Sequence, residues 1–454
     1  MGELFSTVVA FLVTVGVLVV VHEFGHYLAA RAMDVKILRF NIGFGKPLFL
    51  RRRGRDHTEW VVAAVPLGGY VKMLDEREGP VPPGEEPRAF NNKSVWARSF
   101  IVLAGPIANF LLAIALYWVL FVAGMPGDVP VLADPPRGTP AAVAGLASGD
   151  TITHVGDEAV QTWSDVRWAM LKHAVARDET VVEVRSRDGR REVNRLDMSS
   201  LTREDLDQDL LVKLGIRAYR PAFAPRLGPP APASPAERAG FREGDLVTAV
   251  DGVTIATWDE FVGRVRPAAG RRLAVEVERE GAKLVIDAVP EARKDGAGQL
   301  GLQPALAVLK KAYEPFTTTV RYGPAEAAAR AVEKVWDLSV FSVKMLARMV
   351  MGQLSWKNLS GPITIADYAG QSARLGWVTS LGFLALVSVS LGVLNLLPIP
   401  LLDGGHLVYY FAEIVKGTPV SEKTMEIGQR LGLALLLGLT FFAFYNDLNR
   451  LFTG

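Results

Sequence analysis

The sequence contains no cysteine among its 454 residues. This absence excludes disulfide bonds and thiolate metal ligands, and it leaves histidine, aspartate and glutamate as the side chains able to hold a metal ion. The chain also lacks an excess of charge of one sign, because its formal net charge is +2. No basic surplus points to nucleic acid as a partner. The missing cysteines do not decide the redox compartment.

Charged residues are absent from the run 4–21, which is 18 residues long. With the turns that follow, such a run is long enough as a helix to cross ~30 Å of hydrocarbon. The run lacks the basic segment and the small-residue cleavage site of a signal peptide, so we do not expect it to be one. Three later stretches are similarly apolar, so the sequence predicts a polytopic α-helical membrane protein that places four transmembrane helices in the lipid bilayer, at about 4–29, 98–124, 376–397 and 428–447.

A further apolar segment, 336–352, is interrupted by Asp337, Lys344 and Arg348. It contains no uncharged run of transmembrane length, and we expect an amphipathic helix at the outer face or against the core. This helix belongs to a predicted connector, 311–375, between the outer region and the second half of the membrane core.

The short loops predict the orientation, because lysine and arginine concentrate on the cytoplasmic side of membrane proteins. The four residues before Phe5 have neither, and about 250 residues separate the second and third spans. We expect both termini and this central region on the periplasmic side, and the loops after the first and third spans in the cytoplasm. The basic residues of these two loops include Arg31, Lys36, Arg39, Lys46, Arg51, Arg52, Arg53, Arg55, Lys72, Lys416, Lys423 and Arg430.

The first span runs into the pattern His22-Glu23-Phe-Gly-His26. Residues four apart share a helix face, so both imidazoles can point to one metal ion, with Glu23 beside them to activate a water. The alternative is a structural pair of histidines bonded to neighbouring helices. Charged groups within a span cost roughly 2.5–3.5 kcal/mol each on insertion scales and are functional by default. The pattern predicts a zinc site that hydrolyses peptide bonds inside the bilayer.

The third span ends in Asn395-Leu-Leu-Pro398-Ile-Pro400-Leu-Leu-Asp403-Gly-Gly-His406. Two prolines cannot continue a regular helix, and open backbone at membrane depth must line a cavity or be buried in protein. A catalytic zinc needs a third protein ligand, and Asp403 is our prediction for it. His406 is the alternative ligand, or else a packing histidine. Asn395 is expected to hold the oxyanion or the substrate backbone.

The outer region contains an internal repeat with an offset of 95 residues. A repeat of this length indicates a duplicated small domain and not a solenoid of short units. Each copy is expected to be a short helix ending at glycine, a Gly-Asp turn and an alternating strand. We predict an α+β fold for both, at 127–221 and 222–310, joined by a semi-rigid proline-rich linker, 221–232. The matching segments are Thr139–Asp150 with Ser234–Asp245 and Thr162-Trp163 with Thr257-Trp258.

Both copies resemble PDZ domains of the bacterial protease type. The resemblance extends to Leu214-Gly-Ile and Leu300-Gly-Leu, which are similar to a carboxylate-binding loop. PDZ domains capture extended chains by strand addition. The alternative is that the two PDZ-like domains bind no peptide and act as a steric cover that excludes large substrates from the membrane site.

Taken together, these motifs resemble the site-2 protease family along nearly the full length of the chain. The motifs that carry the resemblance are the His22–His26 and Asn395–Asp403 patterns, Phe40–Gly45, Pro66–Met73, Phe90–Ser94, Gly105–Asn109 and Ser360–Pro362. The resemblance implies a zinc endopeptidase of a bacterial inner membrane that makes the second cut in regulated intramembrane proteolysis during a stress response. Its substrates would be single-span membrane proteins already shortened on the outer side, chiefly an anti-sigma factor, and signal peptide remnants.

The same resemblance implies that Gly43, Phe44 and Gly45 lie in a re-entrant β-loop that pairs with unwound substrate. An ordinary cytoplasmic hairpin is the alternative. Two other functions stay open: a membrane-anchored PDZ scaffold without turnover, and a transporter with broken helices. The intact motif, with one predicted Zn²⁺ per chain, argues against the scaffold. The absence of an inverted repeat between the two halves of the membrane core, 1–126 and 376–454, argues against the transporter.

Overall fold

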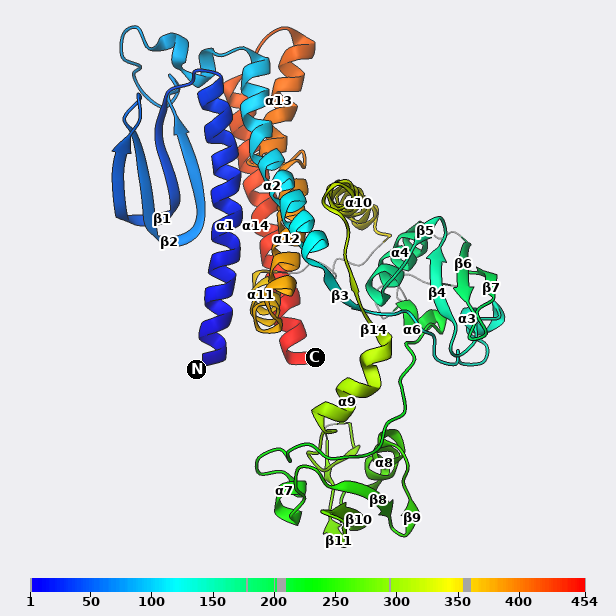
Figure 1. Cartoon of the computed structure of the whole chain (residues 1–454). Helices are drawn as coiled ribbons and strands as arrows, with labels where there is room; N and C mark the ends of the chain where they lie inside the picture. Colours follow the sequence, from blue (N-terminus) through cyan, green and yellow to red (C-terminus); the bar gives the residue numbers. More distant parts are fainter. Residues whose placement is uncertain are drawn as a thin grey trace. The chain divides into compact units, whose positions relative to one another are not determined.

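The computed structural model describes residues 2–176, 179–199, 201, 210–293, 295–353 and 361–453. The chain forms two compact units. One comprises Met1–Met125 and Val320–Gly454, and the other comprises Pro126–Thr319. The first unit is mainly helical with one sheet, and the second contains the remaining sheets with short helices (Figure 1).

Four helices in the described part of the chain are long and apolar enough to cross a membrane. They coincide with the four predicted segments, and they are α1 (Gly2–Ala32), α2 (Val95–Ala123), α12 (Trp377–Asn395) and α14 (Glu422–Thr453). The segment predicted as an amphipathic helix forms the end of a longer one, α10 (Pro324–Val350), which is not among the four. Its buried residues follow helical spacing, and they include Ala327, Ala331, Val335 and Leu338.

The first unit, Met1–Met125 and Val320–Gly454, contains the four apolar helices and is called the membrane unit. Helix α2 is its centre, because α1, α10, α12 and α13 (Asp403–Lys416) all pack against it. The helix begins after Ser94, whose side chain accepts a hydrogen bond from the Ala97 backbone N–H, and it ends at Gly124, whose φ is 97°. Glycine adopts such a backbone at little cost. The approach of α1 to α2 is unusually close at Gly25, where an added Cβ would lie 2.8 Å from the Ala108 Cβ. Small residues at this crossing bring the motif helix onto α2.

The predicted backbone break after the third span is present. Helix α12 ends at Asn395 and α13 begins at Asp403, with non-helical chain between them. Leu401 in this stretch has a φ of 97°, a conformation that is strained for a residue with a Cβ. The glycines after Asp403 pack tightly against the break, since a Cβ on Gly405 would lie 2.7 Å from the Pro400 Cα.

The C-terminal helix α14 contacts α11 (Pro362–Leu375) through a buried carboxylate. Asp447 accepts hydrogen bonds from the backbone N–H groups of Gly361, Ile363 and Thr364 at 3.0, 2.9 and 3.1 Å. These are donors that the first turn of a helix leaves unsatisfied. Asp447 therefore caps α11 from another helix and ties the end of the chain to the membrane unit.

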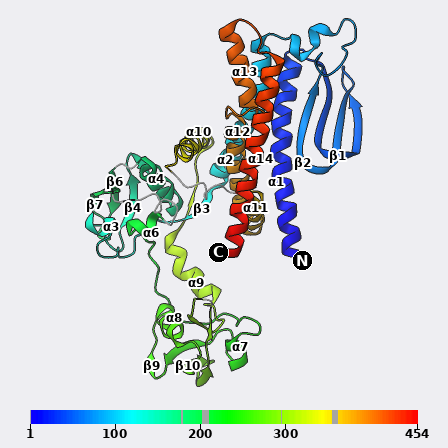
Figure 2. The same cartoon turned by 180° about the vertical axis from the view of Figure 1, so that it is seen from behind.

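Strands β1 (Ile37–Arg53) and β2 (Thr58–Met73) form a sheet beside α1 (Figures 1 and 2). Both strands bend on themselves. Residues 37–44 lie opposite 65–73 and also opposite 59–62, while 47–53 lie opposite 58–63. The sheet is therefore four segments wide. It packs on α1 at the level of the motif, because a Cβ on Gly69 would lie 3.1 Å from Val19 and 3.2 Å from Glu23.

The repeated sequence folds into two four-stranded sheets with the same order of strands. The first sheet has the order β5-β4-β6-β7, and the second has the corresponding order β9-β8-β10-β11. Separate hydrophobic cores support them. The strands are β4 (Thr151–Val155), β5 (Glu158–Ala159), β6 (Thr180–Arg185), β7 (Arg191–Leu196), β8 (Leu246–Val250), β9 (Val253–Thr254), β10 (Leu273–Arg279) and β11 (Ala282–Ala288).

Local contacts repeat between the copies as well. Thr139 and Ser234 each cap a short helix through the side-chain oxygen, at α3 (Pro140–Val143) and α7 (Pro235–Ala239). The aspartates of the two Gly-Asp turns accept equivalent backbone N–H groups, from Ala147 to Asp150 and from Arg242 to Asp245, both at 2.9 Å. The predicted order of short helix, Gly-Asp turn and strand is thus confirmed in both copies.

The proline-rich stretch 221–232 is not simply a linker, contrary to the prediction. Arg226 forms an isolated β-bridge with Leu246, and Leu227 forms one with Pro304. The Leu227 side chain is fully buried in the hydrophobic core of the second copy. Apolar burial of this leucine joins the stretch to the second copy.

The remaining elements are short. They are η1 (Glu86–Arg88), η2 (Phe90–Asn92), β3 (Met125–Asp128), α4 (Trp163–Ala176), α6 (Leu210–Leu214), α8 (Trp258–Val265), η3 (Arg266–Ala268), β12 (Glu291–Ala292), β13 (Gly298–Gln299), α9 (Leu306–Tyr313), η4 (Glu314–Phe316) and β14 (Thr317–Val320), of which β12 pairs with β13 and β3 with β14.

Candidate metal centre

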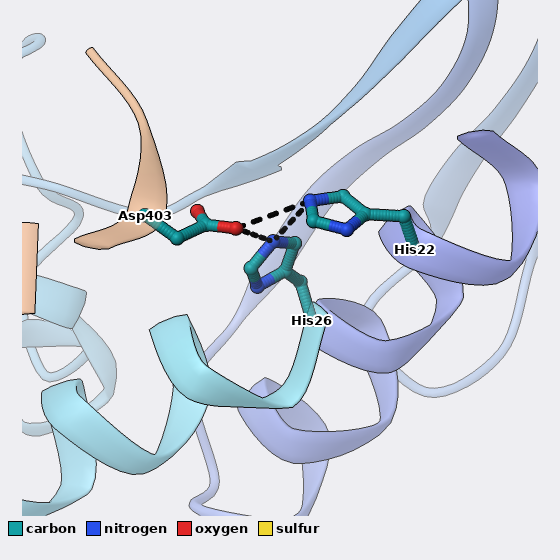
Figure 3. Close-up of side chains that lie close together, drawn as sticks. All are labelled: His22, His26 and Asp403. Carbon is teal, nitrogen blue, oxygen red and sulfur yellow. Dashed lines mark hydrogen bonds and ion pairs between the residues drawn. The ribbon is translucent and has the colours of Figure 1, made fainter. Parts of the chain in front are cut away.

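Three predicted ligands meet in the membrane unit. His22 and His26 project from one face of α1, and Asp403 reaches them from the first residue of α13 (Figure 3). The Asp403 Oδ2 lies 3.2 Å from the His22 Nε2 and 3.5 Å from the His26 Nε2. The two Nε2 atoms are 3.2 Å apart. In the described part of the chain, these residues form a group of side chains close enough to hold one metal ion.

This triangle fits zinc. A tetrahedral zinc ion with bonds of 2.0–2.2 Å keeps neighbouring ligand atoms about 3.3–3.6 Å apart, and the observed separations of 3.2, 3.2 and 3.5 Å lie within about 0.1 Å of this range. The Asp403 Oδ2 is buried and has no hydrogen-bond partner among the described residues, although it faces two imidazole nitrogens. A bound cation would satisfy this oxygen. The side chains are 12% exposed for each histidine and 18% for Asp403, so the group is largely but not fully buried.

The other ring nitrogens of the histidines are held by protein groups. The His26 Nδ1 donates to the Ile101 carbonyl of α2 at 2.9 Å. The His22 Nδ1 lies 3.1 Å from the Asn109 side-chain amide and 3.4 Å from that of Asn395. An N–H donated from Nδ1 leaves Nε2 as the metal-binding atom, so these contacts orient both rings.

Space for the two rings comes from Gly105 on α2. A Cβ at this position would lie 2.6 Å from the His26 Cε1 and 2.8 Å from the His22 Cε1. Ordinary carbon contacts are about 3.5–4.0 Å. Only a residue without a side chain leaves room for both imidazoles here.

Glu23 lies between the two histidines in sequence and is half-buried. Its side chain lies beside Gly69 of β2, where an added Cβ would be 3.2 Å from the Glu23 Cγ. Glu23 therefore lies beside the edge segment 65–73 of the sheet.

The other predicted site residues are distributed as follows. Asn395 reaches His22, as described above, whereas Gly43, Phe44 and Gly45 lie at a bend of β1 and do not belong to the ligand group. Gly43 packs on the Val65 carbonyl, and Phe44 is 51% exposed. His406 does not join the described ligand group. Its ring packs 6.4 Å from that of Tyr409.

Sequence reasoning missed the contribution of α2. Ile101, Gly105 and Asn109 are spaced by four residues and present one helical stripe to the histidines. The motif Gly105–Asn109 was a signal, because an asparagine within an apolar run indicates a buried polar contact. Its partner could not be read from the pattern.

Comparisons with known proteins agree with this geometry. The sequence profile of peptidase family M50 matches residues 10–439. The regulator of sigma-E protease RseP of Escherichia coli is 42% identical over 97% of this chain and 98% of its own. A Ralstonia nicotianae protein, whose name describes it as a zinc metalloprotease, is 41% identical over 98% of this chain and 99% of its own.

Among solved structures, the PDZ domain of the SdrC-like protein of Listeria monocytogenes matches 19% of this chain and 90% of its own, at 18% identity and a TM-score of 0.16. This score assigns no fold. The full-length matches are of a different kind, since the family profile covers most of the chain and both relatives are above 40% identical over nearly its whole length. The chain is a zinc metalloprotease of the site-2 type and belongs to peptidase family M50.

Proposed function

We propose that the protein cleaves single-span membrane proteins within the bilayer, using one Zn²⁺ per chain held by His22, His26 and Asp403. The observation that carries this proposal is the ligand triangle, with edges of 3.2, 3.2 and 3.5 Å. Two of its three members lie on α1, a helix long and apolar enough to cross a membrane. When bound, zinc supplies Lewis acidity, polarising the scissile carbonyl and lowering the pKa of a water toward ~7.

Glu23 is the proposed general base. It takes a proton from the attacking water and returns it to the leaving amine nitrogen. Asn395, whose amide lies 3.4 Å from the His22 Nδ1, is proposed to donate to the developing oxyanion or to the substrate backbone.

The sheet formed by β1 and β2 is proposed to hold the substrate in an extended conformation. A helical substrate hides its peptide bonds in its own hydrogen bonds, and strand addition would expose them. Segment 65–73 runs next to Glu23, and Gly43 packs on the start of this segment at Val65. Phe44, 51% exposed beside it, offers an apolar contact to the substrate, while Gly43 and Gly45 permit close backbone approach.

The substrate class is proposed from the relatives. The Escherichia coli protein is named a regulator of sigma-E protease. We infer that the present chain likewise acts in envelope stress signalling, on an anti-sigma factor already cut on its outer side, and on signal peptide remnants. The proposed location is the bacterial inner membrane, with both termini and the outer region periplasmic and the zinc site near the cytoplasmic side.

The two repeat copies are proposed to be tandem PDZ-like domains, at 127–221 and 222–310. The supporting feature is a contact that recurs in both. Gly215 and Gly301 of the Leu-Gly-Ile and Leu-Gly-Leu turns have φ of 80° and 76°. Each packs against the side chain that caps the short helix, Thr139 in the first copy and Ser234 in the second.

Selection by size is the role we favour for these domains, because side-chain pockets discriminate poorly among apolar spans. Removal of residues 127–310 should leave the zinc content unchanged and permit cleavage of full-length, uncut substrate. A deletion variant that still requires a shortened substrate would exclude the cover role.

The proposed activity is tested with a purified anti-sigma-type membrane span. The wild-type chain should release two products whose masses place the cut within the span, and Glu23→Gln should release none while retaining zinc. A membrane-anchored PDZ scaffold without turnover, the second candidate, would bind the span and leave it uncut in both cases.

A further inference from the structure

Asn109 is a buried polar residue to which the proposed mechanism gives no part. It lies on α2, its side chain is fully buried, and its amide is 3.1 Å from the His22 Nδ1. Its backbone carbonyl accepts a hydrogen bond from the Ser388 hydroxyl of α12 at 2.7 Å. Ser388 is fully buried as well. Asn109 is therefore fixed at the contact between α2 and α12, directly behind a predicted metal ligand.

We propose that Asn109 is a positioning residue that holds the His22 imidazole, through an acceptor bond to Nδ1–H, in the tautomer that binds zinc through Nε2. This inference rests on the proposed zinc site. The His22 Nε2 faces Asp403 and His26, so it must be the free, metal-binding nitrogen. The ring proton then resides on Nδ1, which needs an acceptor.

The amide of Asn109 supplies that acceptor. Its Oδ1 is buried without a hydrogen-bond partner in the described structure, while its Nδ2 faces the His22 Nδ1. Which amide atom occupies which position is assigned from the hydrogen-bond network. A half-turn about the Cβ–Cγ bond exchanges the two amide atoms, so that the oxygen accepts the Nδ1–H and the amide nitrogen takes the position that the oxygen held.

The two amides near His22 thereby acquire different tasks. Nδ1 carries one proton and forms one strong hydrogen bond. Asn109 is nearer than Asn395, 3.1 against 3.4 Å, and it is fully buried, whereas Asn395 is partly exposed. Asn109 holds the ligand, and Asn395 is left to turn toward the substrate.

The test measures the zinc affinity of the full-length protein by competition with a chromogenic chelator. Asn109→Leu keeps the approximate size of the side chain and removes the acceptor, and it should weaken zinc binding roughly 10- to 100-fold, the usual cost of losing such a partner. Asn109→Asp retains an acceptor in the same place and should bind zinc with an affinity within about threefold of wild type. Asn395→Leu, the matched control, should keep zinc and lose cleavage.

Melting temperatures separate positioning from folding. Asn109→Leu should lose much of the stabilisation that zinc confers, with the zinc-free melting temperature close to that of wild type. Equal zinc affinity of Asn109→Leu and wild type would overturn the proposal. An Asn109→Asp variant that binds zinc as weakly as Asn109→Leu would overturn it as well, because the loss would then come from the amide N–H donor and not from the acceptor oxygen. A wild-type chain without zinc affinity would instead refute the metal site itself.

Discussion

Gly105→Ala adds one methyl group at the most crowded point of the metal centre. The new Cβ would lie 2.6 Å from the His26 Cε1 and 2.8 Å from the His22 Cε1. Ordinary contacts of about 3.5–4.0 Å leave it short by roughly 1 Å. Neither ring can turn away without losing its bond at Nδ1, to the Ile101 carbonyl for His26 and to the amide of Asn109 for His22.

Two opposing effects decide the result. Alanine is favoured over glycine within a helix by roughly 1 kcal/mol, whereas overpacking a core by one methyl costs about 1–3 kcal/mol. Zinc sites tolerate departures of only about 0.2 Å in ligand distance, so most of the strain should appear as lost metal affinity. We expect zinc binding to weaken by more than about tenfold, which corresponds to roughly 1.4 kcal/mol or more.

Chelator competition and metal analysis of the purified protein measure this effect. Gly16→Ala is the matched control, because Gly16 lies in α1 and its Cβ would meet no atom within 4 Å. This control should bind zinc as the wild type does. If Gly105→Ala also bound zinc within about threefold of wild type, the rings would have room that the structure does not give them, and the reasoning would fail.

Three further predictions concern the base, the third ligand and the outer region. Glu23→Gln should abolish cleavage and keep zinc, because the residue is proposed as a base and not as a ligand; cleavage within about tenfold of wild type would contradict that role. Asp403→Ala should lose both zinc and cleavage while His406→Ala retains the metal, as measured by metal analysis, and the reverse pattern would move the ligand to His406. Burial alone would raise the pKa of Asp245, but the Arg279 guanidinium at 2.7 Å and a backbone N–H hold it below its usual value. A lowered pKa adds stability that is complete above the unfolded value of about 3.9 and is lost as the pH falls through the folded value, so acid unfolding of the second copy below about pH 4 should become less steep in Asp245→Asn, and an unchanged acid limb would refute the pairing.

The fold could be predicted from the sequence wherever the pattern is local or repeated. An uncharged run of 18 residues predicts a membrane helix by its length alone. The two histidines share a face because four residues make about one helical turn. The 95-residue repeat predicted two similar folds, and both copies have the same strand order. The proline-rich stretch was misjudged, since Leu227 is buried in the second core.

The resemblance carried the sequence reasoning further than the residues alone. It suggested that Gly43, Phe44 and Gly45 belong to a sheet near the site, and the strands do run beside α1. It did not indicate which segment approaches Glu23. That proved to be 65–73, because β1 and β2 bend back on themselves and the pairing of four segments is set by long-range hydrogen bonds.

The sequence by itself determined the membrane helices, the duplicated outer folds and the pair of histidines, because helical periodicity and covalent neighbours decide these. Only the tertiary structure decided how Asp403 meets the histidines at 3.2 and 3.5 Å, and which groups hold the far side of each ring. Such contacts join α1, α2 and α13 at points far apart in the chain. They depend on two glycines that lack a side chain. Gly25 lets α1 approach α2 closely, and Gly105 leaves the space on α2 that the two imidazoles fill.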